Sequence, residues 1–369
     1  MTHPALLWAA LNRRFAENPG MRQRLFARTG RGSADDRSFI LEALASELPP
    51  GWEEDAREEL NRAQRHGAAV LTIEDESYPP LLRASSDPPP VLYVWGDMRP
   101  EDVLAVAVVG SRRATPLGLQ VAADLGRGLA ASGFTVVSGL ARGIDAASHR
   151  GALDGGGRTI AVLGSGLDRI YPVEHRALAE SIARRGAVVT EFPFGAAPLR
   201  RHFPERNRVI ASLSWATVVV EAAAGSGSLI TADLAADEGR AVCAVPGSVD
   251  DPNAAGTNAL LRAGALLCRG AADVLEDLAP QIVEAAGALA ASRSPQPPLP
   301  GLAAPGGLAA DERRVLEKVP RTRGIGIEKL GEACGMAPGA LLATLLELEL
   351  RGLVRQLPGR RFLSAACKF

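Results

Sequence analysis

The sequence predicts an α/β protein built on a doubly wound, mostly parallel sheet, with a small helical domain before it and a winged-helix domain after it. Three observations support this fold class. Six short apolar runs alternate with helical stretches between residues 103 and 247, the first 70 residues show helical spacing, and three helices with a hairpin follow residue 310. A chain of 369 residues is long enough for two or three such domains.

The bulk composition is that of a globular protein, with 47% hydrophobic and 22% charged residues and a formal net charge of −1. Such a chain is not expected to coat nucleic acid over its whole surface, but it leaves room for a local basic groove. The N-terminus lacks the residue order of a signal peptide, no apolar run would span a bilayer, and the four cysteines form no C-x-x-C pair. We therefore expect a cytoplasmic protein without membrane contact, metal site or disulfide framework.

Residues 1–70 are predicted to form the small helical domain. Leu6, Leu7 and Ala10 lie at helical spacing, and the segments "SFILEALASEL" and "WEEDAREELNRAQRHG" also have helical patterns. The Gly-rich segment "ARTGRGSADD" fits two interpretations. It is either a connector or the turn of a small DNA-binding fold of the SAM or helix-hairpin-helix type.

Residues 71–284 are predicted to form the central domain. Five prolines in "YPPLLRASSDPPPVLYVWGD" exclude a regular helix and predict an extended lead-in that packs Leu92 and Val94 against the sheet. The runs that follow are continuously apolar, as strands covered on both faces require: "VLAVAVVG", "FTVVSGL", "TIAVLGSG", "AVVTEF", "ATVVVEA" and "AVCAVPG". Ligands of such a sheet bind beyond the carboxyl ends of its strands.

The C-terminal part divides into a linker, residues 285–309, and a winged-helix domain, residues 310–369. The linker is rich in Pro, Gly and Ala and has no periodicity. The leucines of "ALLATLLELEL" are expected to fill a three-helix core. Eleven Lys and Arg against seven Asp and Glu make this domain mildly basic, which fits a DNA-binding or a protein-binding module.

The turn after the first apolar run predicts an anion site. Thr115 followed by Pro116 is a typical helix start, so residues 110–113, "GSRR", precede a helix N-terminus, where backbone amides and arginine favour phosphate. A plain turn is the alternative. The G-x-G-x-x-G pattern is absent, so no dinucleotide cofactor is expected.

The second run ends in a further glycine-rich turn, "SGLARGIDAASH". Gly139 and Gly143 permit close backbone approach, and Arg142 lies where the next helix begins. Asp145 fits either a binding role or a helix N-cap, and His149 fits either a functional role or core packing. Similar small-residue turns follow in "LGSGLDRIYP" and "EAAAGSGSLIT", which together suggest a long ligand rich in phosphates.

The segment "PLRRHFPERNRVIASL" combines positive charge with an aromatic ring. We expect Pro204 to start a helix whose buried face is Val209, Ile210 and Leu213. Its basic residues would then lie in the preceding loop and the first turns, and they are Arg200, Arg201, Arg206 and Arg208.

Phe203 is expected in the loop before this helix, where its ring could stack on a base. Because any base serves for stacking, the combination with arginine points to single-stranded nucleic acid more than to a mononucleotide. The alternative is a buried ring, with the arginines paired to Glu191, Glu205 or Glu221.

These ordered motifs resemble the DNA-processing protein A family (DprA, also called Smf) of bacterial transformation proteins. The resemblance covers about 200 residues, from "YPPLL" to "GTNALLRAGA". It implies a Rossmann-like domain that binds single-stranded DNA, forms a homodimer and loads the RecA recombinase without catalysing a reaction and without a cofactor. It assigns DNA contacts to Gly110, Ser111, Arg112, Gly139, Arg142, Gly143, Arg200, Arg201, Phe203, Asn207 and Arg208.

The resemblance leaves open whether Arg200 or Arg201 fills the position where relatives often carry lysine. It also motivates a homodimer near "GTNALLRAGALL", where Leu260, Leu261 and Leu266 could supply apolar contact. A different function class remains as the alternative, a nucleotide-binding Rossmann enzyme of the phosphoribohydrolase type with Glu221 as general acid.

Overall fold

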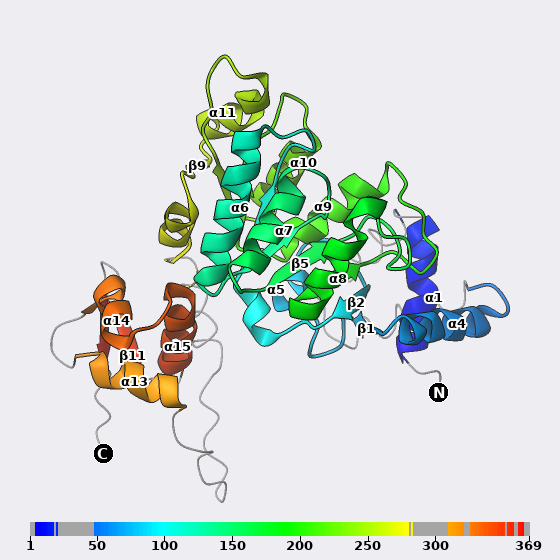
Figure 1. Ribbon diagram of the computed structural model, residues 1–369. Coiled ribbons are helices and arrows are strands. Elements are labelled where there is room, and N and C mark those ends of the chain that lie inside the picture. Colours follow the sequence, from blue (N-terminus) through cyan, green and yellow to red (C-terminus); the bar gives the residue numbers. More distant parts are fainter. Residues whose placement is uncertain are drawn as a thin grey trace, which may run out of the picture. The chain divides into compact units, whose positions relative to one another are not determined.

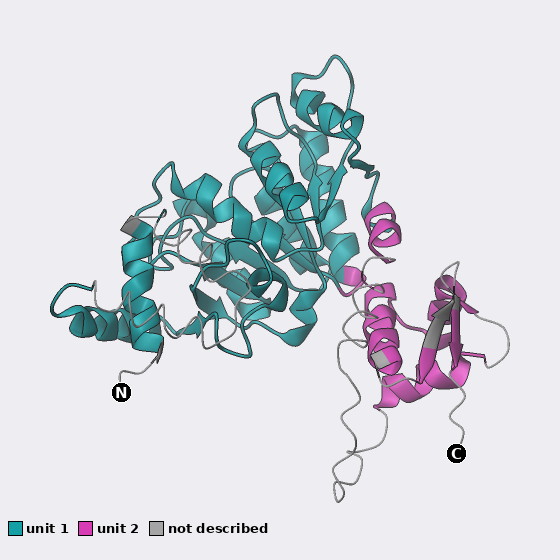
Figure 2. Ribbon diagram, turned by 180° about the vertical axis from the view of Figure 1, so that it is seen from behind, with its two compact units in different colours: residues 1–130, 134–272 teal, residues 131–133, 273–369 magenta. Residues whose placement is uncertain are grey.

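The computed structural model describes residues 4–17, 20, 48–279, 282, 309–320, 325–350, 353–357 and 361–364. The chain divides into two compact units, residues 1–130 with 134–272 and residues 131–133 with 273–369 (Figure 2). Each unit has a hydrophobic core of its own.

A nine-stranded sheet forms the centre of the first unit (Figure 1), in the order β1-β2-β6-β5-β4-β3-β7-β8-β9. Seven neighbouring strands are parallel: β3 (Ala105–Val109), β4 (Thr135–Ser138), β5 (Thr159–Val162), β6 (Ala187–Thr190), β7 (Ala216–Val219), β8 (Ala241–Ala244) and β9 (Leu266–Leu267). At one edge, β2 (Val91–Gly96) pairs antiparallel with β6, and β1 (Ala68–Thr72) pairs antiparallel with β2. The predicted fold class is confirmed, and all six apolar runs are strands.

Helices cover both faces of this sheet. Those of the first unit are α1 (Pro4–Glu17), α4 (Trp52–Arg65), α5 (Pro80–Arg83), α6 (Pro116–Ala131), α7 (Ile144–Asp154), α8 (Arg176–Arg185), α9 (His202–Ser212), α10 (Gly227–Asp237) and α11 (Ala255–Arg262), with the 3-10 turns η1 (Pro100–Val103), η2 (Val173–His175) and η3 (Pro252–Ala254). Helices α6 and α7 touch closely, because a Cβ at Gly151 would lie 2.0 Å from the Ala123 carbonyl oxygen. Both helices begin where β3 and β4 end, so this contact fixes the two connecting loops relative to each other.

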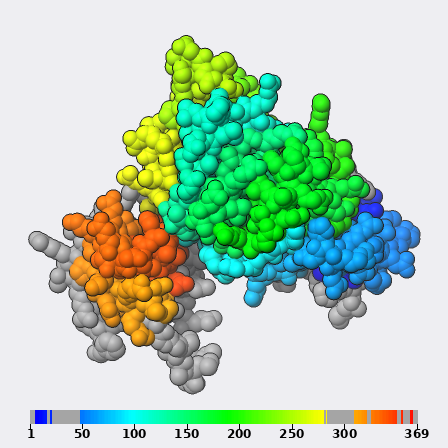
Figure 3. Space-filling model, viewed as in Figure 1, coloured from blue at the N-terminus to red at the C-terminus, as the bar shows by residue number. Residues whose placement is uncertain are grey.

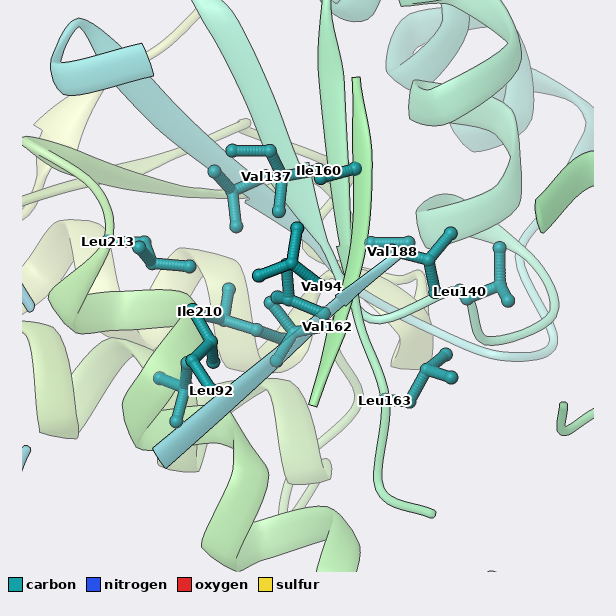
Figure 4. Close-up of a cluster of buried hydrophobic side chains, with 14 of the residues drawn as sticks. Leu92, Val94, Val137, Leu140, Ile160, Val162, Leu163, Val188, Ile210 and Leu213 are labelled. Atoms are coloured by element: carbon teal, nitrogen blue, oxygen red, sulfur yellow. The ribbon is translucent and has the colours of Figure 1, made fainter. Parts of the chain in front are cut away.

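The core lies between the sheet and these helices (Figure 4). Val137, Ile160 and Val188 from three neighbouring strands are buried, together with Ile210 of α9. Their β-branched side chains suit strands that are covered on both faces.

The proline-rich lead-in differs from the prediction in one respect. Leu92 and Val94 are buried as expected, but they lie on β2, a full strand of the sheet. The prolines also do not exclude a helix, because α5 begins at Pro80. Proline is well tolerated in the first helical turn, where its missing amide hydrogen has no helical acceptor.

The predicted boundary near residue 70 does not separate two compact units. Trp8, Leu11 and Phe15 of α1 are buried in the same core cluster as the sheet residues, and the Asn12 Nδ2 atom donates to the Glu191 carbonyl oxygen at 2.8 Å. Strand β1 itself spans residues 68–72. The segments "ARTGRGSADD" and most of "SFILEALASEL" lie outside the described residues, so the choice between a connector and a DNA-binding helical fold is not addressed by the structure.

The second unit contains α13 (Ala310–Lys318), β10 (Ile325–Gly326), α14 (Ile327–Cys334), α15 (Pro338–Leu350), β11 (Val354–Leu357) and β12 (Arg361–Ser364), seen in orange and red in Figure 3. Its three strands pair in the order β10-β12-β11. Val315, Leu330, Leu345 and Phe362 are buried between the helices and this small sheet. The arrangement is the winged helix that the sequence predicts. Within the described residues of both units, no helix is long and apolar enough to cross a membrane.

Candidate nucleic-acid interface

A groove lies where the strand order reverses. The chain passes from β3 through β4 and β5 to β6 in one direction, and from β7 to β8 and β9 in the other. The loops that follow β3 and β7 therefore diverge, which is where doubly wound sheets bind their ligands. Between them is a cavity of about 1110 Å³ whose lining comes from the loops after β3, β4, β5, β6, β7 and β8 and from helices α9 and α10.

The loop after β3 is held in place by Glu221, which follows β7. The Ser111 amide donates to the Glu221 carbonyl oxygen at 2.7 Å, and the Thr115 amide donates to the Glu221 carboxylate at 2.9 Å. Thr115 also caps α6, because its hydroxyl accepts from the Gly118 amide at 3.0 Å. The predicted helix start at Thr115 and Pro116 is thus confirmed.

Arg112 and Arg113 extend from this fixed loop and line the groove. Both side chains are exposed, and neither forms an ion pair with any residue that the structure describes. Two guanidinium groups without a carboxylate partner, placed just before the N-terminus of a helix, favour the binding of phosphate.

The contacts of Glu221 argue against the enzymatic alternative. Its carboxylate accepts from the Thr115 amide and, at 2.5 Å, from the Thr115 hydroxyl, and a Cβ at Gly118 would collide with it. Glu221 is not among the residues that line the groove. A general acid must reach the substrate, so this glutamate serves to position the loop instead.

The loop after β4, residues 139–143, is organised by Asp145. Its buried carboxylate accepts from the Gly139 and Ala141 amides at 3.1 and 3.3 Å. These bonds stabilise a loop in which Leu140, a buried residue, has a left-handed φ of 58°. Asp145 is therefore a structural residue that bonds to loop amides, whereas the N-cap of α7 is Gly143.

His149 is a core residue. It is fully buried, its Nδ1 atom lies 2.7 Å from the Thr159 hydroxyl, and burial lowers its pKa to about 3. The packing interpretation is the one that fits these contacts.

Helix α9 begins at His202, two residues earlier than predicted, so Phe203 lies in its first turn and not in the preceding loop. The ring is half-buried and lines the groove. A Cβ at Gly164 would lie 3.1 Å from it, so glycine at that position makes room for the ring. The Arg112 guanidinium lies over the ring at 4.9 Å from its centroid, and the Tyr171 ring lies beside it at 5.7 Å.

Arg206 is almost fully buried and forms part of the groove floor. Its Nη1 atom donates to the Gly139 carbonyl oxygen at 2.7 Å and also to that of Val162. Burial lowers its pKa to about 10, against the attraction of the Asp145 carboxylate, so it remains a cation at neutral pH. A Cβ at Gly139 would lie 2.6 Å from this guanidinium. The packing of Arg206 therefore requires glycine at position 139 whether or not DNA is bound.

Arg208, predicted as a DNA contact, points into the protein. Its side chain is only 11% exposed, and it is paired with Glu191 and, at 3.3 Å, with Asp87. Because the buried Glu191 and the partly exposed Asp87 already neutralise its charge, we do not propose Arg208 as a DNA contact. This part of the alternative interpretation, arginine paired with Glu191, is the correct one.

Other predicted residues fall around the groove. Gly110, Ser111, Arg112, Arg200, Phe203 and Asn207 line it. Gly139 and Arg142 line a small cleft that shares Arg112 and Phe203 with it.

Three residues that were predicted to contact DNA either bond to another part of the protein or do not line the groove. Arg142 is exposed but donates through Nε to Glu174 at 2.6 Å. Gly143 lies under the loop after β3, because a Cβ there would be 2.2 Å from the Ser111 carbonyl oxygen. Arg201 is exposed and does not line the groove.

Several lining residues were missed. Tyr171 occurs in the quoted motif "LGSGLDRIYP", yet nothing in its spacing marks it as a groove residue. Asn253 reaches the groove from η3, after β8. The turn at residues 225–228 lines the groove as expected, but its Ser226 hydroxyl already accepts from the Ser228 amide at 3.4 Å and so caps α10.

The fold and the site together define a Rossmann-like α/β protein with a basic, aromatic groove at its switch point, followed by a winged helix. Residues 69–279 match the family model described as DNA recombination-mediator protein A, and residues 294–360 match that of the DprA winged helix domain. The chain belongs to the DNA recombination-mediator protein A family, also called DprA or Smf.

Relatives and solved structures agree with this assignment. Protein Smf of Synechocystis sp. is 37% identical over 326 residues, which cover 82% of each chain. The X-ray structure of DNA processing protein A from Streptococcus pneumoniae superposes with a TM-score of 0.54 at 38% identity, covering 62% of this chain and 82% of that one. A structure from Helicobacter pylori, described as showing the single-stranded DNA binding mode of DNA processing protein A, gives 0.52 at 31% identity and covers 58% and 96%.

Proposed function

We propose that this chain is a noncatalytic single-stranded-DNA-binding protein that protects incoming DNA and loads the RecA recombinase during natural transformation. One observation carries the DNA-binding part. Arg112, Arg113 and Arg200 are exposed on the groove without ion pairs to described residues, and they line it together with Phe203, whose ring lies under the Arg112 guanidinium. Cations for the backbone beside a ring for the bases form the usual site for single strands.

The groove suits a strand better than a mononucleotide. At about 1110 Å³ it lies above the usual range of small-molecule pockets. The single-stranded DNA named in the description of the Helicobacter pylori structure supports the same ligand class.

Fluorescence anisotropy with a labelled oligothymidylate tests the proposal. We expect binding that weakens steeply with salt, because neutralised phosphates release counterions, and weaker binding to a duplex of equal length. Nucleoside monophosphates incubated in parallel should release no free base. Base release, or the absence of binding to single strands, would contradict the proposal.

The RecA part rests on the family membership. Added protein should accelerate RecA-dependent strand exchange on DNA that is coated with a single-strand-binding protein. A groove variant such as Arg200→Ala should lose this acceleration in proportion to its loss of DNA affinity. Both proposed partners, incoming DNA and RecA, would place this activity in the cytoplasm.

We also propose a homodimer formed near α11. Leu260 packs partly against the core, while Leu261 and Leu266 are half-buried at the same end of the unit, beside the exposed Leu267. A two-fold pair would present two grooves and bind long strands with avidity. Sedimentation at micromolar concentration should show a dimer, and Leu261→Arg should produce monomers.

A further inference from the structure

Tyr171 presents a large ring to the groove without an assigned role. Its side chain is 39% exposed and lines both the groove and the adjoining small cleft. A tyrosine that served only the core would be covered by other side chains. The neighbouring arginines make this exposed ring part of the same surface that the DNA is proposed to occupy.

The loop after β5 holds the backbone just before Tyr171 in place. The Ser165 hydroxyl donates to the Arg169 carbonyl oxygen at 2.7 Å, and the Asp168 carboxylate accepts from the Gly195 amide at 2.8 Å. Tyr171 follows directly after this bonded turn. A ligand that binds to the ring therefore has less backbone to order, which lowers the entropy cost of binding.

The two rings of the groove are close but not parallel. The centroids of Tyr171 and Phe203 are 5.7 Å apart, and their planes are inclined by 52°. Bases within a continuous stack are parallel to one another. Two bases that each lie flat on one of these rings therefore cannot stay stacked on each other.

We propose that Tyr171 is a second base-binding residue and that its inclination to Phe203 makes the groove select strands whose neighbouring bases separate easily. This inference rests on the proposed single-strand binding. Thymine runs stack weakly and adenine runs stack strongly, so opening the strand costs less in oligothymidylate. A duplex, whose bases are held in one stack, is disfavoured for the same reason.

The inference is tested on the full chain by measuring its affinity for a twelve-nucleotide oligothymidylate and for an oligodeoxyadenylate of the same length, and taking the ratio of the two affinities. The native protein should favour the thymidylate. Tyr171→Ala should weaken thymidylate binding at least about fivefold and move the ratio toward one, with an unchanged salt slope because stacking releases no counterions. Tyr171→Phe should keep the ratio, and Tyr171→Leu, which still packs against Phe203 but offers no flat ring, should behave like alanine.

Val173→Ala is the matched control, because Val173 is 70% exposed just beyond the same loop and does not line the groove. It should change neither affinity nor ratio.

Photocrosslinking of the native protein to an oligothymidylate that carries 5-iododeoxyuridine gives a second measurement, which does not depend on the folding of any variant. Crosslinked peptides should include Tyr171. If Tyr171→Ala binds normally with an unchanged ratio, or the ring never crosslinks while Phe203 does, the inference is wrong although the proposed function stands. If the native protein binds neither oligonucleotide, both fail.

Discussion

The loop before α9 and the helix itself show how differently one residue type is used within a few positions. Arg200 is exposed on the groove, with no ion pair to any described residue. Arg206 is 3% exposed and bonds to backbone carbonyl oxygens inside the protein. The side chain of Arg208 is 11% exposed and pairs with Glu191 and Asp87. Arg200 lies in the loop before α9, whereas Arg206 and Arg208 lie on the helix and bond to groups that follow the strands. Arg206 forms part of the groove floor, but its guanidinium is already bonded to the Gly139 and Val162 carbonyl oxygens.

This comparison teaches that a cluster of arginines in the sequence is not one functional surface. Part of the positive charge is proposed to neutralise phosphate, and part ties α9 to the sheet and its loops. Mutation of the first group should lower the affinity for DNA, and mutation of the second should lower the free energy of unfolding.

Arg208→Ala should have the largest effect, on stability. Removing the guanidinium leaves the buried Glu191 carboxylate without this partner, and breaking a buried pair costs about 3–5 kcal/mol of unfolding free energy. Urea unfolding followed by circular dichroism measures the loss. The folded fraction should still bind single strands with the native salt slope, and a stable variant with weak DNA binding would move Arg208 to the groove side.

Phe203→Ala tests the groove side. If a base stacks on the ring, the change should cost about 1–3 kcal/mol of single-strand affinity while the salt slope stays nearly constant. The half-buried ring should contribute less to stability than a core phenylalanine, whose removal costs roughly 3–5 kcal/mol. Anisotropy titrations and thermal melts of the same preparation separate the two. Duplex binding should suffer less, and equal losses on both substrates would mean that the ring only shapes the groove.

Arg112→Ala and Arg200→Ala should each reduce the slope of log affinity against log salt by about one, because each removes one phosphate contact. The loss should be similar for all base sequences. Titrations at several salt concentrations measure the slope. For Arg112 the loss of its contact with the Phe203 ring adds a small term that does not depend on salt. Unchanged slopes in both variants would refute the proposed groove.

Arg201→Ala should have the smallest effect. Arg201 is exposed next to Arg200 but does not line the groove, so its removal should leave both the salt slope and the unfolding free energy unchanged. The pair Arg200 and Arg201 thus forms a matched comparison of neighbouring cations. A larger loss at Arg201 would assign it the role that we give to Arg200.

The amino-acid sequence by itself determined the parts that depend on local pattern. Continuous apolar runs mark strands that are buried on both faces, and all six such runs are parallel strands. The dipeptide Thr115-Pro116 marks the start of α6, and the leucine pattern after residue 338 marks the core of the winged helix. The positions of the glycine-rich turns followed from these elements, because the ends of parallel strands meet at one edge.

Tertiary structure decided which side chains of those turns remain available. Arg208 bonds to Glu191, 17 residues away, and to Asp87, 121 residues away, while Glu221 bonds to Thr115 across 106 residues. The position of Tyr171 beside Phe203 likewise depends on two loops meeting in space. Periodicity and spacing report on neighbours within one element, so the pairing of distant charges and rings, and with it the choice between a structural and a binding arginine, appears only when the chain is folded.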